Sequence, residues 1–317
     1  MRVAFDSRAA ADRGGIGRYV RSLLPALRRL AHGTVFEADR PGRADVFHAP
    51  CVAGALLRPP TPMVVTVHDL VPLKRRGELL RAGLRVRLRS LAVQRAVRLI
   101  VPTRVVAEDA AELLHVDRGR IVVVPEAATP HLGPRSAGEV ASVRANYGLP
   151  ERYLLWVGDL EHPEPRKRVA ELAATRRRLP LVLVGAAGRW VRELDDVTVT
   201  GQVPDRDLAA MYTGAHALVF PSDDEGFGLP PVEALACGTP VAACDVPALR
   251  EVLGDRASFV PPGDLDALVA AAEAASRPAP APPAWSWEDA ARATWDVYRE
   301  AAASRGPAVP RRASDRR

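Results

Sequence analysis

The sequence predicts an α/β protein with two doubly wound domains, each built on a parallel sheet, and three observations lead to this prediction. The chain has 317 residues, which is enough for two domains that each bury a core. Short apolar runs alternate with segments of helical periodicity, as a parallel sheet with crossover helices requires. A stretch rich in Gly, Pro and Ser, residues 127–150, is typical of a linker between domains.

The composition argues against a nucleic-acid-binding protein, a disulfide-linked protein and a membrane-spanning protein. The net charge is +6, but only Lys74 and Lys167 among the 44 basic residues are lysines. With abundant Ala and Pro, this bias indicates GC-rich coding rather than nucleic-acid binding, and aromatic residues do not interleave with the basic ones. The three cysteines lack disulfide or metal spacing, which predicts a reducing, cytoplasmic location. No apolar run of about 20 residues predicts a membrane span, and the first residues read as a strand rather than a signal peptide.

The first half opens with a strand at residues 3–5. Residues 12–19, D-R-G-G-I-G-R-Y, then lead into an amphipathic helix that extends to about Leu30. The glycines of this loop, Gly15 among them, do not have the G-x-G-x-x-G spacing of a dinucleotide site. Without a ligand, the loop would be a glycine-rich turn before a helix.

The next predicted strands are residues 45–49 and 63–67. One histidine, His48, lies within the first strand, and another, His68, directly follows the second. His68 follows the second strand, at the carboxyl end where open α/β sheets bind ligands. It is therefore a candidate site residue, with a buried structural histidine as the alternative. For His48, the buried structural role is the one we predict.

Residues 74–98 carry Lys74 and eight arginines against a single acid, Glu78. Their leucines recur at helical spacing. The pattern predicts a helix that packs on the core and has a solvated basic face. The alternative is a helix that docks peripherally on an anionic membrane.

The rest of the first half contains a strand at 98–103, a helix near 104–115 and a strand at 120–126. The second half begins with a strand at 153–158, followed by E-P-R-K-R at 164–168. Further strands are predicted at 181–185, 197–203, 241–245 and 258–262. Two D-x-D strings, at 205–207 and 264–266, stand at helix starts, where aspartate caps are common, so we predict capping and no metal site.

The stretch 220–241 carries the strongest signal. An apolar strand ending at Phe220 is followed by a polar turn and a Gly-Phe-Gly loop, and a helix then begins near two prolines. Free N–H groups at such a helix start form an anion site, and glycines let a ligand approach the backbone. Glu225 and Glu233 flank the loop with seven residues between them. Two carboxylates in this place suit a ligand rich in hydroxyl groups.

Residues 225–241, E-G-F-G-L-P-P-V-E-A-L-A-C-G-T-P-V, resemble without a gap the E-x7-E signature of family 4 retaining glycosyltransferases, of the group 1 or mannosyltransferase type. The resemblance extends to G-G-I-G-R-Y, to H-D at 68–69 and to E-P-R-K-R, where Arg168 replaces an asparagine and His162-Pro163 look inserted. It covers the chain from Gly14 to about residue 273.

The resemblance implies a GT-B fold, in which two Rossmann-like domains face each other across a cleft. The expected divisions are an acceptor-side domain at 1–130, a linker at 131–150 and a nucleotide-sugar domain at 151–280. A helix at 285–304 would cross back to the first domain, and a disordered tail would occupy 305–317.

The resemblance also implies roles for individual residues. Lys167, Arg166 and the backbone of Gly226, Phe227, Gly228 and Leu229 would bind the donor diphosphate. Glu233 would hold ribose hydroxyls, Glu225 the donor sugar, and His68 the sugar from the other domain, while Gly15 would lie in the cleft. His68, Lys167 and Glu225 are the candidate catalytic residues.

The activity expected from this resemblance is the transfer of mannose or another hexose from a nucleotide-sugar to an acceptor hydroxyl with retention of configuration. The acceptor would be a glycan, a lipid-linked saccharide or a small molecule, and no metal or cofactor beyond the donor is expected. Lipid-linked acceptors would place the protein on the inner face of the cell membrane. The alternatives are a GT-B nucleotide-sugar epimerase and a non-catalytic module that binds sugar nucleotides.

Overall fold

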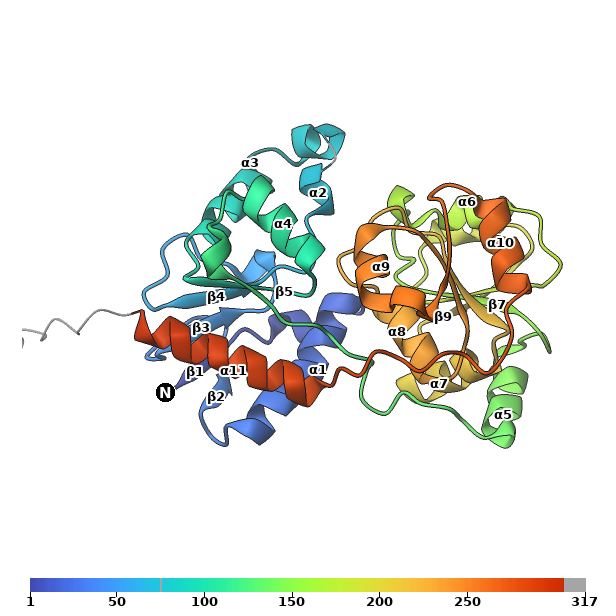
Figure 1. Cartoon of the computed structure of the whole chain (residues 1–317), viewed down its shortest axis with the longest axis horizontal. Helices are drawn as coiled ribbons and strands as arrows, with labels where there is room; N and C mark the ends of the chain where they lie inside the picture. The colour runs from blue at the N-terminus through green and yellow to red at the C-terminus, as the bar shows by residue number, and fades with distance from the viewer. Residues whose placement is uncertain (75, 305–317) are drawn as a thin grey trace, which may run out of the picture.

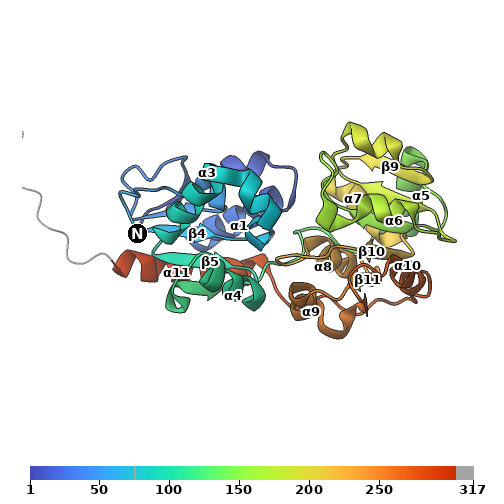
Figure 2. The ribbon, with the colours of Figure 1, turned by 90° about the horizontal axis from the view of Figure 1, so that it is seen from above.

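A computed structural model of the chain describes residues 1–74 and 76–304. Two six-stranded sheets form its two domains, and helices cover both faces of each sheet (Figure 1; Figure 2 shows the layers from above). All recorded strand pairs are parallel. The predicted α/β class with two doubly wound domains is therefore confirmed.

The N-terminal domain has the strand order β2-β1-β3-β4-β5-β6. Its strands are β1 (Val3–Phe5), β2 (Val35–Glu37), β3 (Val46–Ala49), β4 (Met63–Thr66), β5 (Arg98–Val101) and β6 (Ile121–Val123). Its main helices are α1 (Gly15–Leu30), α2 (Val71–Lys74), α3 (Arg76–Gln94) and α4 (Arg104–Leu113). Short 3-10 turns lie at Arg8–Ala11, Val52–Gly54 and Arg118–Arg120. The order reverses next to β1, which is the topological switch point where open α/β sheets bind ligands.

The C-terminal domain has the strand order β12-β11-β10-β7-β8-β9. Its strands are β7 (Leu154–Val157), β8 (Leu181–Val184), β9 (Val197–Gly201), β10 (Ala217–Phe220), β11 (Val241–Cys244) and β12 (Ser258–Val260). Its helices are α5 (Ala137–Tyr147), α6 (Val169–Ala174), α7 (Asp205–Gly214), α8 (Leu229–Ala236), α9 (Pro247–Leu253) and α10 (Leu265–Glu273). Three 3-10 turns, Pro165–Lys167, Arg189–Glu193 and Gly254–Arg256, complete it.

The central strands are short apolar runs because both of their faces are covered. All residues of β4, β7, β8, β10 and β11 are buried. Parallel strands with helices on both faces need this continuous apolar pattern rather than an alternating one. The edge strand β9 is only half-buried along its length, because the crossover between β8 and β9 is a five-residue 3-10 turn rather than a full helix.

The last helix, α11 (Trp287–Ala303), returns to the N-terminal domain and packs along α1 (Figure 1). Trp287 and Tyr298 on this helix are buried in the same apolar cluster as Val3 and Leu23. The Tyr298 hydroxyl lies 2.6 Å from Nδ1 of His48, whose Nε2 lies 2.8 Å from Thr66 Oγ1. His48 is fully buried, and burial lowers its pKa to about 3. The prediction that His48 is a structural core residue is thus confirmed.

Two segments differ from what the sequence indicated. The stretch 131–150, predicted as a linker, contains α5, which packs beside α7. Ser136 and Glu139 form a reciprocal capping box at the start of α5, a signal that is readable in the sequence. Strand β2 was not predicted, because it has three residues and only its first is fully buried.

Helix α3 also departs from the expected amphipathic packing. Its backbone breaks at Gly83, where φ is 54°. Leu84, Leu88 and Leu91 are 71%, 40% and 48% exposed, so the prediction that these leucines pack on the core is wrong. The side chains of Arg81 and Arg85 lie outside the described residues, and so does the stretch 305–317, which was predicted to be a disordered tail.

Candidate active site

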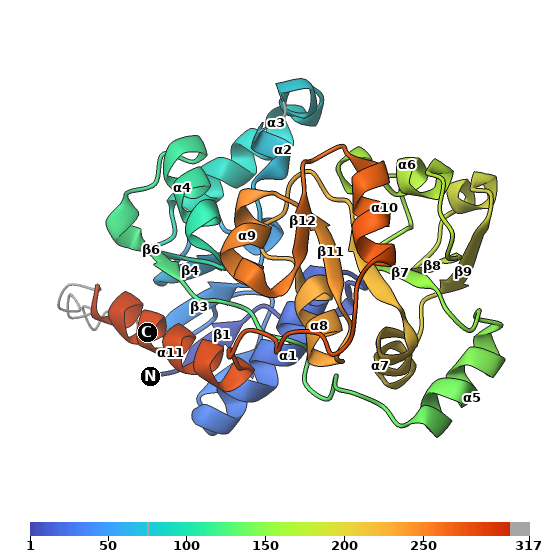
Figure 3. The same ribbon diagram turned by 45° about the vertical axis from the view of Figure 1, so that its right-hand side comes forward.

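The candidate residues lie at the carboxyl ends of strands in both domains. His68 comes two residues after β4, and Glu225 follows β10. The E-P-R-K-R segment comes after β7, the strand that pairs with β10. Carboxyl ends of parallel strands share one edge of the sheet, which is where such folds bind ligands. Figure 3 shows α8 and α9 of the C-terminal domain turned toward the N-terminal domain.

Arg166 and Glu225 form a direct ion pair with an N–O distance of 3.4 Å, and both side chains are 15% exposed. Arg166 also contacts Glu164 at 3.3 Å, and the Lys167 ammonium pairs with the same Glu164 carboxylate. Burial raises the pKa of Glu225, an effect that the charges of Arg166 and Lys167 offset only in part. The structure therefore brings three of the predicted site residues into one charged cluster.

Hydrogen bonds to the loop before Glu225 fix the position of this cluster. The Arg166 carbonyl accepts from the N–H of Asp223 at 2.9 Å, and the Arg166 guanidinium donates to the Asp224 carbonyl at 2.9 Å. Arg168, in the left-handed conformation with φ 48°, donates to the Asp223 carboxylate at 2.7 Å. The E-P-R-K-R turn is thus tied to the loop that precedes Glu225.

The Gly-Phe-Gly loop is packed on both sides. Gly228 caps α8 with φ 91°, and a side chain there would meet Leu249. Phe227 is 4% exposed, and its ring lies 5.7 Å from that of Trp285. Within the described part of the chain, no acceptor is recorded for the N–H groups of Gly226 to Leu229. Unpaired N–H groups at a helix start are a suitable place for an anion.

The N-terminal domain closes directly onto this loop. A Cβ added at Gly226 would overlap the carbonyl oxygen of His68, and the Gly226 carbonyl accepts from Thr103 Oγ1 at 3.0 Å. Gly15 is also close, since a Cβ there would stand 4.0 Å from Leu229. Gly15, His68 and the Gly-Phe-Gly loop therefore meet across the two domains.

Both ring nitrogens of His68 face acceptors. Nδ1 lies 2.9 Å from the Glu126 carboxylate, and Nε2 lies 2.9 Å from the Pro50 carbonyl. An imidazole satisfies two acceptors only when both nitrogens carry protons. Burial alone would lower the pKa of His68, but the hydrogen bond and charge of Glu126 raise it. This arrangement favours the imidazolium form of His68, and the Tyr19 ring lies edge-on 4.6 Å away.

Glu233 is buried, with 1% of the residue exposed. Its carboxylate accepts from Arg18 of the other domain at 3.1 Å, from Tyr212 at 3.2 Å and from Thr129. Burial raises the pKa of Glu233, and the charge of Arg18 offsets part of the effect. The structure does not bring Glu233 into the Arg166–Glu225 cluster but pairs it with Arg18.

Two further polar contacts join the domains. Lys74 lies 2.7 Å from Asp109 and 3.1 Å from Asp224, so one ammonium bridges the two domains beside Glu225. The Glu251 carboxylate on α9 accepts from the N–H groups of Arg104 and Val105 at 2.8 and 3.1 Å. A carboxylate at the start of α4 also interacts favourably with the helix dipole.

The two D-x-D strings behave differently. Asp264 caps α10 by accepting from the N–H of Ala267 at 3.0 Å, as predicted. The capping prediction is wrong for the other string, because Asp205 pairs with Arg18 and Asp207 accepts from Tyr147. Across residues 1–74 and 76–304, no group of three or more His, Cys, Asp or Glu side chains is arranged to hold a metal ion. None of the described helices combines the length and apolar character that a membrane crossing requires.

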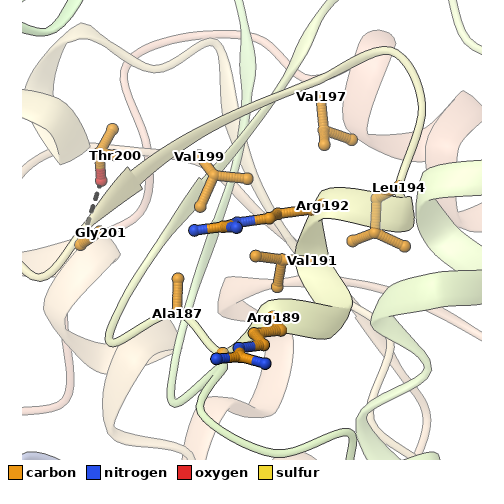
Figure 4. Close-up of a pocket in the computed structure, with 10 residues that line it drawn as sticks. Ala187, Arg189, Val191, Arg192, Leu194, Val197, Val199, Thr200 and Gly201 are labelled. Atoms are coloured by element: carbon orange, nitrogen blue, oxygen red, sulfur yellow. Dashed lines mark hydrogen bonds between the residues drawn. The ribbon is translucent and has the colours of Figure 1, made fainter.

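A separate cavity of about 510 Å³ lies between the Arg189–Glu193 turn and β9 (Figure 4). Arg189 and Arg192 lie on it beside the apolar side chains of Val191, Leu194 and Val199. It shares no residue with the Arg166–Glu225 cluster. The short crossover after β8 accounts for this opening, because a full helix would cover the edge strand.

Two family models match successive parts of the chain. "Glycosyltransferase Family 4" matches residues 35–130, and "Glycosyl transferases group 1" matches residues 151–277. The two segments fall on the two sheets and together take in more than half of the chain. The chain therefore belongs to the glycosyltransferases of family 4 and group 1.

Curated relatives agree with this family. The O-antigen chain mannosyltransferase B of Escherichia coli is 36% identical over 183 residues, which are 50% of this chain and 46% of that protein. The D-inositol 3-phosphate glycosyltransferase of Xylanimonas cellulosilytica is 33% identical over 285 residues, 76% of this chain and 66% of the relative. The chain thus spans about half to two thirds of the length of these two relatives.

Two solved structures share the arrangement of the two domains. Sucrose-phosphate synthase from Thermosynechococcus elongatus has a TM-score of 0.68 at 20% identity, covering 96% of this chain and 97% of that one. The Anabaena protein HepE, solved with UDP-glucose, has a TM-score of 0.67 at 15% identity, covering 96% and 99%. The fold is therefore GT-B, as the resemblance implied.

Several residues at or near the candidate site were not singled out as site residues from the sequence. Four of them, Arg18, Thr103, Glu126 and Tyr212, contact predicted site residues. The fifth, Glu251, joins the two domains at the start of α4. Arg18 was readable, because it is the only charged residue within G-G-I-G-R-Y. Glu251 lies on an ordinary helix of the second domain, and no local pattern distinguishes it.

Proposed function

We propose that this chain is a retaining hexosyltransferase, which moves mannose or another hexose from a nucleotide-sugar to an acceptor hydroxyl. The observation that carries the proposal is the charged cluster of Arg166, Lys167 and Glu225 beside the unpaired N–H groups of Gly226 to Leu229. Cations and N–H groups stabilise the negative charge of a departing nucleoside diphosphate. No cofactor other than the donor, and no metal ion, is part of the proposal.

Each site residue has a proposed role. Arg166 and Lys167 contact the diphosphate, exchanging Glu164 for phosphate oxygens. Glu225 contacts the donor sugar, and Glu233 accepts from ribose hydroxyls. His68 contacts the sugar from the other domain through its carbonyl or its cationic ring, since both ring nitrogens are already engaged. Opening of the domains would admit the donor, because Glu233 is 1% exposed in the closed arrangement.

The names of the relatives and the ligand of a solved structure bear on both the donor and the acceptor. HepE was solved in complex with UDP-glucose, and the relatives at the sequence level are a mannosyltransferase and an inositol-phosphate glycosyltransferase. We therefore propose a nucleotide-hexose such as a UDP-hexose as donor, and a glycan, a lipid-linked saccharide or a small molecule as acceptor.

The test is a transfer assay with the purified chain, a panel of nucleotide-sugars and acceptors of the three classes. Nucleotide release that requires an acceptor would support a transferase, whereas release from no donor would contradict it. NMR of the product should show retained anomeric configuration. Epimerised sugar with no acceptor adduct would favour an epimerase, and donor binding without turnover would favour a non-catalytic module.

We also propose peripheral docking of α3 on an anionic membrane. Leu84, Leu88 and Leu91 are exposed, and Arg87 and Arg89 are exposed beside them. Exposed leucines can enter the interface, and each arginine near an anionic surface contributes about 1 kcal/mol.

Vesicle flotation tests the docking of α3. Binding should require anionic lipid, weaken with salt as charges are screened, and fall when the three leucines are changed to asparagine. Loss of binding when Arg81, Arg85 and Arg89 become glutamine would agree with this. Equal recovery with neutral and anionic vesicles, or recovery with neither, would contradict the proposal and favour a soluble acceptor.

A further inference from the structure

Arg18 belongs to the N-terminal domain but makes its charged contacts in the other one. It stands in the first turn of α1, which positions it at the edge of the cleft. One guanidinium nitrogen donates to Glu233 at 3.1 Å and to Thr129 at 3.0 Å, and the other donates to Asp205 at 3.1 Å. The Arg18 side chain is 18% exposed, and that of Glu233 is 2% exposed.

The groups around Glu233 show why its contact with Arg18 matters for the charge of the carboxylate. The titratable groups facing it are Arg18 from α1, Tyr212 and Asp205 from α7, and Cys237 at the end of α8. Arg18 is the only cation of this set. A buried carboxylate without a counter-charge is costly and tends to take up a proton instead. The ionised form of Glu233 therefore depends on a residue that belongs to the other domain.

The three hydrogen bonds of the Glu233 carboxylate leave one acceptor position unused. Oε1 accepts from Arg18 and Thr129, and Oε2 accepts from Tyr212. An ionised carboxylate accepts about four hydrogen bonds, so one position remains, on Oε2. A hydroxyl donor bound at this position would add to the contact with Arg18 rather than compete with it.

We propose that Arg18 is a positioning residue that acts across the cleft, fixing the orientation and the charge of Glu233 for a hydroxyl group of the donor nucleotide. This inference rests on the proposed function of Glu233 as the ribose ligand. Closure of the N-terminal domain then completes the nucleotide site of the other domain. The donor is held more tightly in the closed state because its carboxylate partner is ionised only there.

Calorimetric titration with UDP, GDP, ADP and TDP, each alone, tests the proposal on the full chain. For the nucleotide that the wild type binds, Arg18→Gln should raise the Kd roughly tenfold, about 1.4 kcal/mol. The loss should grow as the pH is lowered toward the ordinary carboxyl range, because Glu233 without Arg18 takes up a proton at higher pH. Arg18→Lys, which keeps the charge, should recover part of the affinity and all of the pH profile.

Three variants keep the outcome interpretable. Arg28→Gln is the matched control, because Arg28 lies on the same helix in an exposed pair with Glu37; its Kd should equal that of the wild type. In a Glu233→Gln background, Arg18→Gln should add no further loss and no pH dependence. An unchanged Kd in Arg18→Gln, or the same fold loss with and without Glu233, overturns the inference while leaving the proposed function intact.

A wild type that binds none of the four nucleotides overturns the proposed function, and the inference with it. If circular dichroism shows that Arg18→Gln is unfolded, Arg18→Lys decides the matter. A pH profile like that of the wild type supports the charge role, and a loss that grows as the pH is lowered contradicts it.

Discussion

The carbonyl oxygen of His68 packs against the Cα of Gly226 across the two domains, with room for a hydrogen atom but not for a methyl group. The hydroxyl of Thr103 holds the same glycine by donating to its carbonyl at 3.0 Å. Closure of the N-terminal domain over the Gly-Phe-Gly loop therefore depends on the missing side chain of Gly226.

Gly226→Ala should therefore leave each domain folded and hold them apart. A displacement of about 1 Å between the reacting groups can cost roughly 10²-fold in rate, so we expect transfer to fall by at least that factor. Gly133→Ala is the matched control, because a Cβ there meets nothing within 4 Å. Small-angle scattering should show a more open molecule for Gly226→Ala alone; an unchanged rate would refute the contact as a closure element.

Lys167→Ala and Glu225→Ala should each keep the fold and cut transfer by about 10²–10³-fold, the usual cost of losing one preorganised charge contact. Glu108→Ala removes a carboxylate of similar size from an exposed pair with Arg118 and should leave the rate unchanged. The measurement is kcat with saturating donor, alongside circular dichroism. Turnover near that of the wild type in either site variant would remove that residue from the proposed site.

Chelation with EDTA should leave transfer largely unchanged. Within residues 1–74 and 76–304, no cluster of side chains is arranged to hold a metal ion, and the proposed stabilisation of the diphosphate uses cations of the protein. The measurement is the initial rate before and after dialysis against EDTA. Complete loss of activity that manganese or magnesium restores would contradict the prediction.

Two histidines should each make the free energy of unfolding depend on pH, with opposite signs. Both dependences start from about pH 6.5, the usual pKa of a histidine in the unfolded chain. Burial lowers the pKa of His48 to about 3, so the unfolded state binds a proton that the folded state refuses, and stability is lost as pH falls from 6.5 toward 3. Glu126 raises the pKa of His68, so its contribution is present below 6.5 and is lost as pH rises through the folded value.

Urea unfolding at a series of pH values checks both signs. His48→Gln should flatten the acid side, where the slope for one group approaches about 1.4 kcal/mol per pH unit, and His68→Gln should flatten the alkaline side. Each variant serves as the control for the other. A change on the wrong side of pH 6.5 would show that the histidine concerned is not protonated as described.

Glu251→Ala should weaken the contact between α9 and α4. It removes the acceptor for the N–H groups of Arg104 and Val105, a loss comparable to that of a helix cap, about 1 kcal/mol. Because these groups belong to different domains, we expect a larger radius of gyration in scattering rather than unfolding of either domain. Glu108→Ala, on the exposed side of the same helix, should leave the radius unchanged, and an equal effect of both variants would count against the interdomain role.

How much of the molecule could be predicted depends on how local the signal is. The strand, loop and helix around Glu225 follow from neighbouring residues: an apolar run, glycines where the backbone is approached closely, and prolines at a helix start. By contrast, Arg18 and Glu233 are 215 residues apart in sequence, and no local pattern records that they meet. The same holds for Glu251 and the start of α4.

Two predictions failed because a pattern fits more than one environment. The leucines of α3 recur at helical spacing, yet Leu84, Leu88 and Leu91 are exposed, since periodicity identifies a face of a helix but not what covers it. Asp205 stands in the first turn of α7, where aspartate often caps, but it pairs with Arg18 instead. A charged partner from another domain outweighs a local hydrogen bond.

The chain passes between the two domains twice, once after β6 and once before α11 (Figure 1). These passages are fastened together, because Nε1 of Trp287 donates to the carbonyl of Ala128 at 2.9 Å. The C-terminal domain is thus an insertion whose two connections to the N-terminal domain lie side by side. Any movement of one domain relative to the other would turn about this shared connection, so that Gly226 and Glu233 would meet the same partners again when the domains close.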